Sequence, residues 1–368
     1  MGVGKEILII RLSSIGDVIH CTPVAKTLKM VWPDCKITWL VSSVSADVIR
    51  YNPDIDECWV WSRERFEAYL KSWEIASAIK MWRELKNKLA EKYFDAVLDI
   101  HGLFLTGLIA LQAKTRRRIG LKEARELNYV FMTETARPLG RHVIDKYLGV
   151  LQALDIKKFN YKMTVTLPLT VKSVANDILR AGTIKPDQRF AVLIPGTTWP
   201  AKNWPPEYFA VVAKALEQDF KLVLGGGLAD VKCGEAIIAK AGVPMLNTIG
   251  RTSLLELAAI INQAAVVITG DTGPLHIASA LETPVVALFG PTNPLVYGPR
   301  QGKFSTLQSE SDCLFCHKYN CPKGNAECMK KILPERVILA VYQLTGIDRR
   351  NRQNEIDYSK LARHKPSS

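Results

Sequence analysis

The sequence has no long apolar segment. No uninterrupted apolar run reaches the about 18 residues that a membrane-spanning helix needs, so we expect no transmembrane helix. The first residues lead directly into a strand-like run, Ile7 to Ile10, without the apolar stretch and cleavage site of a secretory signal peptide. These two absences predict a cytoplasmic protein.

Acidic residues are also in short supply. Asp and Glu total 36 against 49 Lys and Arg, which gives a formal net charge of +13. This excess favours an acidic partner, either a nucleic acid, an anionic membrane surface or a phosphorylated substrate. No zinc-finger or RNA-recognition signature accompanies it, so we expect no nucleic-acid partner. The alternative is a metal-dependent nucleic-acid protein, which salt-sensitive DNA binding would reveal.

Length and pattern predict two α/β domains. The chain has 368 residues and is 48% hydrophobic, which is ample for two cores. Strand-like and helix-like segments alternate throughout, as in doubly wound parallel sheets. The character changes over 160–188, where Thr164 to Leu169 has a β-like pattern. We therefore predict an amino-terminal domain at 1–170, a carboxyl-terminal domain at 185–332, and a last helix with a basic tail at 333–368.

The most informative stretch is 266–294. A strand, a small-residue turn, a helix and a second strand place 270–273 between a strand's carboxyl end and a helix's amino end. Open α/β sheets bind ligands at that edge, and the N–H groups of Thr272 and Gly273 suit a phosphate. Asp271 would repel phosphate, so we expect it to accept bonds from sugar hydroxyls or to orient the loop. Simple capping of the helix by Asp271 or Thr272 is the alternative.

A similar turn follows the first predicted strand. Ser14 and Gly16 are small enough for a ligand or another backbone to approach closely. Asp17 lies just before a helix predicted at His20 to Val31. It either caps that helix or acts as a general base in a cleft, and the turn alone leaves both interpretations open.

Two more turns in the second predicted domain carry ligand-binding residue types. The loop 195–204 contains Thr197, Thr198 and Lys202, which suit phosphate, although the spacing of a Walker loop is absent. A strand at 221–224 ends in three glycines that allow close approach, and Asp230 follows on the same edge.

Basic residues are frequent in the first predicted domain. Residues 63–92 predict a helical excursion whose apolar stripe either packs on the domain or touches a membrane surface. The run 116–118 is either a solvated charge cluster or an anion clamp. His101 follows a strand at 94–100, where a single histidine is more often structural than catalytic.

Four of the eight cysteines lie close together, at Cys313, Cys316, Cys321 and Cys328. In a cytoplasmic protein this density indicates a metal, with zinc as the first candidate. Free or disulfide-paired cysteines are the alternative. The segment 313–317 also matches a haem-attachment pattern, which we set aside because such attachment needs an exported chain.

Five motifs together carry a family resemblance. They are IIRLSSIGD at 9–17, DIHG at 99–102, PGTT and KNW within 195–204, GDTGPLH at 270–276 and FGPT at 289–292. With them the chain resembles glycosyltransferase family 9, the ADP-heptose:lipopolysaccharide heptosyltransferases, from residue 7 to about 300. A cysteine-rich segment like 313–328 also occurs in some members.

The resemblance implies a GT-B fold, with two Rossmann-like domains facing a central cleft. It implies inverting transfer of heptose from ADP-heptose to the Kdo/heptose inner core of lipopolysaccharide, with Asp17 as general base. The implied donor-binding residues are Thr197, Thr198, Lys202, Asp230, Asp271, Thr272, Gly273 and His276. The implied acceptor-binding residues are Ser14, Gly16, Arg63, Arg65, His101, Arg116, Arg117, Arg125 and Arg141.

The resemblance also implies that no cofactor is required, because Lys202 and helix-end amides would stabilise the leaving ADP. Zinc at the four cysteines would be structural. The acceptor's lipid would stay in the membrane, so we expect peripheral binding at the cytoplasmic face of the inner membrane. The excursion at 61–92 favours addition of the first heptose, next to Kdo. The alternatives are a GT-B transferase or epimerase using a UDP-sugar, and a catalytically silent sugar-nucleotide-binding paralogue.

Overall fold

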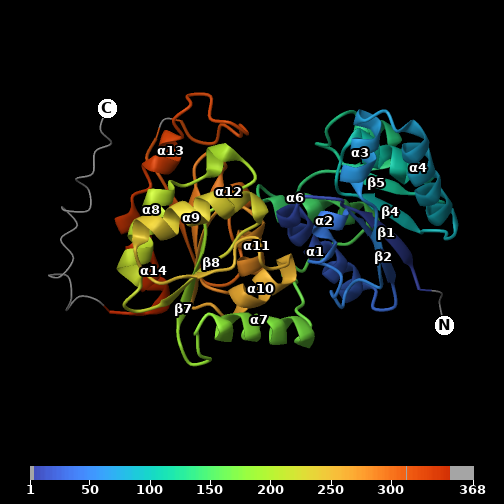
Figure 1. Cartoon of the computed structure of the whole chain (residues 1–368). Coiled ribbons are helices and arrows are strands. Elements are labelled where there is room, and N and C mark those ends of the chain that lie inside the picture. The colour runs from blue at the N-terminus through green and yellow to red at the C-terminus, as the bar shows by residue number, and fades with distance from the viewer. Residues whose placement is uncertain (1–3, 312, 349–368) are drawn as a thin grey trace. The chain divides into compact units, whose positions relative to one another are not determined.

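The computed structural model describes residues 4–311 and 313–348, and the chain divides into two compact units between Pro168 and Leu169. Each unit contains one sheet of six parallel strands with helices packed on it (Figure 1). The α/β class predicted from the alternating pattern is confirmed. Residues 349–368 of the predicted basic tail lie outside the described residues.

The sheet of the first unit has the order β3-β2-β1-β4-β5-β6. Its strands are β1 (Glu6–Ile10), β2 (Lys36–Val41), β3 (Glu57–Val60), β4 (Ala96–Asp99), β5 (Arg118–Leu121) and β6 (Glu134–Ala136). The chain builds outward from β1 to β3, then returns to the other side of β1 with β4. Ligands of doubly wound sheets bind where the strand order reverses, which here is between the carboxyl ends of β1 and β4.

The helices of the first unit differ from the prediction in two places. They are α1 (Ile15–Val31), α2 (Ser43–Ala46), α3 (Arg63–Lys71), α4 (Ile75–Ala90), α5 (Phe104–Gln112) and α6 (Val143–Leu148), with 3-10 helices η1 (Asn128–Phe131) and η2 (Gly149–Leu154). α1 begins at Ile15, not at His20, because Ser14 takes the N-cap position. The predicted excursion is two helices, separated by a break at Trp73, which has φ 60°.

The prediction of a β-like segment at Thr164 to Leu169 was wrong. Residues 157–168 contain no strand, and α7 (Leu169–Ala181) begins at the end of this stretch. Two threonine hydroxyls of α1 take the place of a partner strand. The Thr164 N–H donates to Thr22 Oγ1 at 3.0 Å, and the Asn160 N–H donates to Thr27 Oγ1 at 3.0 Å.

The sheet of the second unit has the order β12-β11-β10-β7-β8-β9, which reverses between β7 and β10. Its strands are β7 (Phe190–Ile194), β8 (Lys221–Leu224), β9 (Leu246–Asn247), β10 (Val266–Gly270), β11 (Val285–Phe289) and β12 (Phe304–Gln308). β7, β10 and β11 are buried along their whole length, because helices cover both faces of the sheet.

Two groups of helices pack on this sheet (Figure 1). One group is α8 (Pro206–Leu216), α9 (Val231–Ala241) and α14 (Pro334–Thr345), and the other is α7, α10 (Leu254–Gln263) and α11 (Gly273–Ala280). The short elements are α12 (Pro294–Tyr297), α13 (Glu327–Lys330), η3 (Pro200–Lys202) and η4 (Leu228–Asp230). Across the described ranges of both units, every helix is too short or too polar to cross a membrane.

Candidate functional site

Three loops meet where the strand order of the second unit reverses. They follow β7 (195–204), β10 (271–272) and β11 (290–293), and these three strands are adjacent and parallel. Gly270 permits this approach, because a Cβ there would lie 3.1 Å from Thr197 Cγ2 and 3.4 Å from the Lys202 carbonyl oxygen. Residues far apart in the chain are thereby brought to one edge of the sheet.

Asp271 is the centre of this edge. Lys202 Nζ lies 2.7 Å from its Oδ2, the Thr292 hydroxyl donates to Oδ2 at 2.7 Å, and His276 Nε2 lies 3.5 Å from Oδ1. Burial alone would raise the pKa of the Asp271 carboxyl, but His276 and the charge of Lys202 outweigh it and hold that pKa well below its usual range. Asp271 is therefore an ionised group within a buried charged cluster. Its contacts go beyond those of a residue that only caps a helix.

The start of α11 lies beside this cluster. Thr272 is the N-cap residue, yet its side chain makes no capping bond, and Pro274 occupies the first turn. The first N–H groups of a helix, here including that of Gly273, have no acceptor within the helix. Lys202 Nζ lies 4.4 Å from the centre of the Trp199 ring. Cationic and N–H donors therefore converge here, as an anion requires.

The other predicted donor residues lie at the same edge. Thr197 Oγ1 lies 2.7 Å from both Asn203 Oδ1 and the Trp199 carbonyl oxygen, and Thr198 is exposed. Asp230 accepts the Gly227 N–H at 2.8 Å and packs against Gly196, where a Cβ would come within 1.9 Å of Asp230 Oδ1. Asp230 thus joins the loops after β7 and β8.

In the first unit, Asp17 lies in the first turn of α1 at the corresponding reversal point. Its Oδ2 lies 2.6 Å from Arg11 Nη2 and accepts the Ser14 hydroxyl at 2.9 Å. Its Oδ1 accepts the Tyr147 hydroxyl at 2.7 Å. Ser14 N also lies 3.4 Å from Oδ2, so Asp17 has a capping contact as well as its other partners. Gly16 is buried beside it in the same turn.

The electrostatics around Asp17 favour its ionised form. Burial would raise the pKa of Asp17, but the charge of Arg11 and the Tyr147 hydrogen bond hold that pKa well below its usual range. His101 accepts the Leu12 N–H at Nδ1, 3.1 Å away. Burial and two arginine charges lower the pKa of His101 to about 3, so it is neutral at physiological pH.

Four of the predicted acceptor-binding arginines lie near this edge or on α3. Arg63 Nη1 lies 3.4 Å from His101 Nε2, and Arg63 also pairs with Glu67 at 2.6 Å. Arg65 is exposed and donates to Tyr69. Arg125 and Arg141 are exposed and follow the carboxyl ends of β5 and β6.

Arg116 and Arg117 lie elsewhere. β5 starts at Arg118, so both arginines are at the amino end of this strand, at the opposite edge of the sheet from Asp17. Arg117 also makes a two-fold ion pair with Glu134, at 2.8 and 2.9 Å. The structure therefore does not bring these two arginines to the site that the resemblance implied.

Sequence reasoning missed three partners. Arg11 and Tyr147 hold Asp17, and Thr292 holds Asp271. Arg11 and Thr292 lie inside the matched motifs at 9–17 and 289–292, so the motifs themselves could have identified these two residues. Tyr147 lies 130 residues from Asp17 and has no such signal.

The four clustered cysteines line one small cavity, together with Ala201 and Pro291 from the loops described above. In the part of the chain that the structure describes, no group of three or more His, Cys, Asp or Glu side chains lies close enough together to hold a metal ion as it stands.

Comparison with known proteins identifies the family. The model of glycosyltransferase family 9 (heptosyltransferase) matches residues 82–327. Lipopolysaccharide heptosyltransferase 1 of Pseudomonas aeruginosa is 28% identical over 333 residues, covering 89% of this chain and 90% of that protein. A family 9 glycosyl transferase structure from Veillonella parvula has a TM-score of 0.80 at 26% identity, covering 94% of this chain and 98% of that one.

The structure of the Escherichia coli ADP-heptose lipopolysaccharide heptosyltransferase II has the same fold, with a TM-score of 0.73 at 22% identity over 92% of this chain and 98% of that one. The two parallel sheets found here are accordingly those of a GT-B fold. Since the family model spans well over half of the chain, this protein is a glycosyltransferase and belongs to glycosyltransferase family 9, the heptosyltransferases.

Proposed function

We propose that this enzyme transfers heptose from ADP-heptose to the inner core of lipopolysaccharide, with inversion at the anomeric carbon and with Asp17 as general base. Its relatives include lipopolysaccharide heptosyltransferases, and one of them is named for ADP-heptose. The observation that carries the proposal is the buried cluster of Lys202, Asp271 and Thr292 beside the start of α11.

This cluster suits a sugar diphosphate because different groups in it would bind the diphosphate and the sugar. Lys202 and the N–H groups at the start of α11 face the same region and would neutralise the diphosphate, including the charge that develops as ADP leaves. Asp271 would repel phosphate, so it would accept hydrogen bonds from the heptose hydroxyls. Thr292 and His276 hold Asp271 in place when the diphosphate competes for Lys202.

The environment of Asp17 suits a base that acts late. Its lowered pKa keeps the carboxylate unprotonated and available, but it also makes the carboxylate weakly basic. Glycosyl transfer passes through an oxocarbenium-like state, in which the attacking hydroxyl becomes acidic only as its bond to carbon forms. A weak, permanently ionised base is sufficient for that step. The Tyr147 and Ser14 hydroxyls and Arg11 fix its orientation.

The test is ADP release from ADP-heptose, with and without a Kdo–lipid A acceptor, with UDP-sugars as donor controls. We expect acceptor-dependent release with the ADP-sugar alone, and an inverted anomeric centre in the product by NMR. ADP release that ignores the acceptor, or turnover of a UDP-sugar instead, would contradict the proposed reaction.

Asp17→Asn separates chemistry from binding. Asn keeps the shape of the side chain and can still accept from Tyr147, so we expect a folded protein that binds ADP normally and transfers heptose at least about 10²-fold more slowly. Transfer at the wild-type rate in this variant would remove Asp17 as the base.

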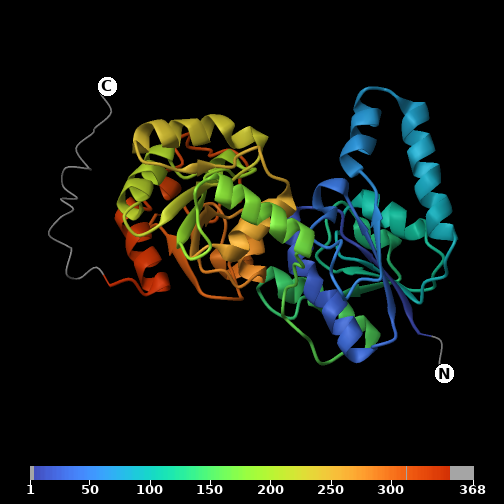
Figure 2. The same cartoon turned by 60° about the horizontal axis from the view of Figure 1, so that its bottom comes forward.

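We further propose that α3 and α4 contact the membrane that holds the acceptor's lipid. These helices lie side by side and extend beyond the sheet of the first unit (Figure 2, light blue and cyan). Trp73 at their junction is 84% exposed, and Leu70 and Ile79 are exposed nearby. Lys71 and Lys80 flank these apolar side chains and match the charge of an anionic headgroup surface.

Cosedimentation with phosphatidylglycerol vesicles tests this contact. We expect wild-type binding that weakens with salt, and weaker binding for Trp73→Gln, which alters no buried packing. Tyr51→Gln changes another exposed aromatic residue of the same unit and serves as the matched control. Equal vesicle binding by all three proteins would contradict the proposed surface.

A further inference from the structure

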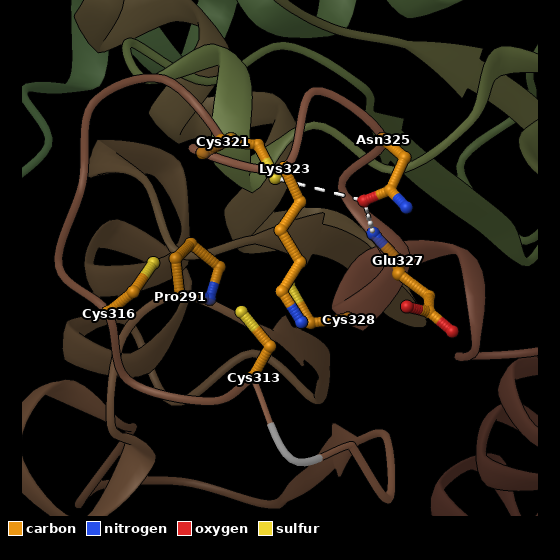
Figure 3. Close-up of a pocket in the computed structure, with 9 residues that line it drawn as sticks. Pro291, Cys313, Cys316, Cys321, Lys323, Asn325, Glu327 and Cys328 are labelled. Atoms are coloured by element: carbon orange, nitrogen blue, oxygen red, sulfur yellow. Dashed lines mark hydrogen bonds between the residues drawn. The ribbon is translucent and has the colours of Figure 1, made fainter.

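Cys313, Cys316, Cys321 and Cys328 all line the same cavity of the second unit. Figure 3 shows the thiols of Cys313, Cys316 and Cys328 around a common hollow, with Cys321 on its other side. The cavity has a volume of about 10 Å³, which accommodates about one water-sized sphere. A void of this size and lining has room for a single ion.

The chain around these cysteines has little else to order it. The described residues between β12, which ends at Gln308, and α13, which begins at Glu327, contain no helix or strand. Connections of this length inside a domain are uncommon unless they carry a function. Phe315, His317 and Ala326 have left-handed φ angles of 56°, 51° and 46°, which non-glycine residues adopt only when their surroundings impose them.

We propose that these four cysteines bind one thiophilic divalent cation, zinc in the first instance, and that the ion holds this segment in its fold. The first two intervals, C-x2-C and C-x4-C, fall within the usual range for structural zinc ligands, and the start of α13 supplies the fourth. All eight cysteines of the chain are free of disulfides in the structure, so the four thiols are available.

The surroundings of the cavity fit a charged thiolate site. Binding replaces four S–H protons by one dication, so four protons leave and the bound group carries a net charge of −2. Lys323 lines the cavity and offsets that charge. The Ala326 N–H donates to Cys321 Sγ at 3.3 Å, which is the kind of hydrogen bond that stabilises a ligating sulfur.

Among the described residues, the four sulfurs do not stand at positions that would coordinate an ion. Rotation from one staggered χ1 position to the next moves a cysteine sulfur by roughly 3 Å. All four side chains line one cavity, so the proposed site requires rotations of this size toward a common point.

The ion would also support the two loops that carry Lys202 and Thr292, in addition to holding the cysteine segment itself. The Ala201 N–H donates to the Tyr319 carbonyl at 3.2 Å, and the His317 N–H donates to the Pro291 carbonyl at 3.0 Å. The cysteine segment is therefore bonded to the loops that carry Lys202 and Thr292. Loss of the ion would loosen both loops.

Metal analysis of the full chain tests the site without any activity measurement. We expect about one zinc per chain by mass spectrometry of the purified, desalted protein, because a structural site of this type is closed by four protein ligands. Cys316→Ser and Cys321→Ser should lose the metal. Cys233→Ser, a half-buried cysteine of the same unit outside the cavity, should retain it.

Cobalt substitution tests the site in the wild-type protein, so its result does not depend on whether the cysteine variants fold. Wild-type protein stripped by a chelator should take up one Co²⁺ with the visible absorption of a tetrahedral thiolate site, and lose thermal stability when stripped again. One iron per chain instead of zinc would also support a single-ion site. The proposal fails if wild type takes up neither zinc, cobalt nor iron, if it holds several irons with labile sulfide, if the cysteines are disulfide-bonded, or if Cys316→Ser keeps the full metal content.

Discussion

Arg11 controls the protonation of Asp17, and replacing it by Gln should make this control visible. Arg11 is 7% exposed, with Nη2 2.6 Å from Asp17 Oδ2 and Nη1 bonded to the Ile100 carbonyl at 3.0 Å. Burial opposes ionisation of Asp17, and the charge of Arg11 is the largest effect that lowers its pKa. An opposite charge at this range lowers a carboxyl pKa by about 1–3 units, so Arg11→Gln should raise it by about that amount.

The same change should reduce stability at neutral pH. In the wild type the folded pKa of Asp17 is depressed below its unfolded value of about 3.9, so Asp17 stabilises the fold above that pH. This contribution is lost as pH falls below about 4 and through the folded pKa. Breaking a buried ion pair costs about 3–5 kcal/mol. We expect the lower end, because Tyr147 and Ser14 still bind an Asp17 side chain that is 29% exposed.

The assay is the pH dependence of kcat/KM for acceptor-dependent ADP release, measured where circular dichroism shows a folded protein. The wild type should show no loss of activity from protonation of Asp17 above about pH 4. In Arg11→Gln the charge of Arg11 no longer offsets the burial of Asp17, so this loss should begin about 1–3 pH units higher than in the wild type and enter the range near or above pH 4. Arg11→Lys keeps the charge and should keep the wild-type profile apart from a lower rate.

An identical acid limb in the wild type and Arg11→Gln would refute the reasoning, because Asp17 would then be either uncoupled from Arg11 or not the base. Asp17→Asn distinguishes these two cases. If it retains transfer, Asp17 is not the base. A shifted limb in Arg11→Lys as well as in Arg11→Gln would show that geometry, and not charge, is what Arg11 supplies.

Three further changes probe the donor side. Lys202→Met should weaken ADP binding about 10–100-fold by calorimetry, since a hydrogen bond to a charged group contributes about 1.5–3 kcal/mol, and an unchanged affinity would exclude Lys202 from the phosphate site. Gly196→Ala should cost about 1–3 kcal/mol in urea unfolding, because its Cβ would collide with Asp230; an unaltered midpoint would show that the two do not touch. Thr292→Val should cost about 1–3 kcal/mol by leaving buried Asp271 short of a donor, whereas Thr292→Ser should be close to wild type.

The sequence by itself determined the class of fold and indicated the turns at which we expect a ligand to bind. Buried strands such as β10 appear as short β-branched runs, and the turns after them carry the small and polar residues that a ligand edge requires. These signals are local, because they depend on side-chain periodicity and turn chemistry within about ten residues. The family resemblance rested on the same turns, and it is confirmed.

Only the tertiary structure decided which of these residues act together. Asp17 lies 130 residues from Tyr147, and Lys202 lies 69 from Asp271, yet each pair is 2.7 Å apart. The tertiary structure also separated Arg117 from the site by placing it at the amino end of β5, and it gathered four cysteines around one cavity. Such contacts follow from which strands lie side by side and at which edge each strand ends. That order is set by long-range packing of whole elements, and no local pattern records it.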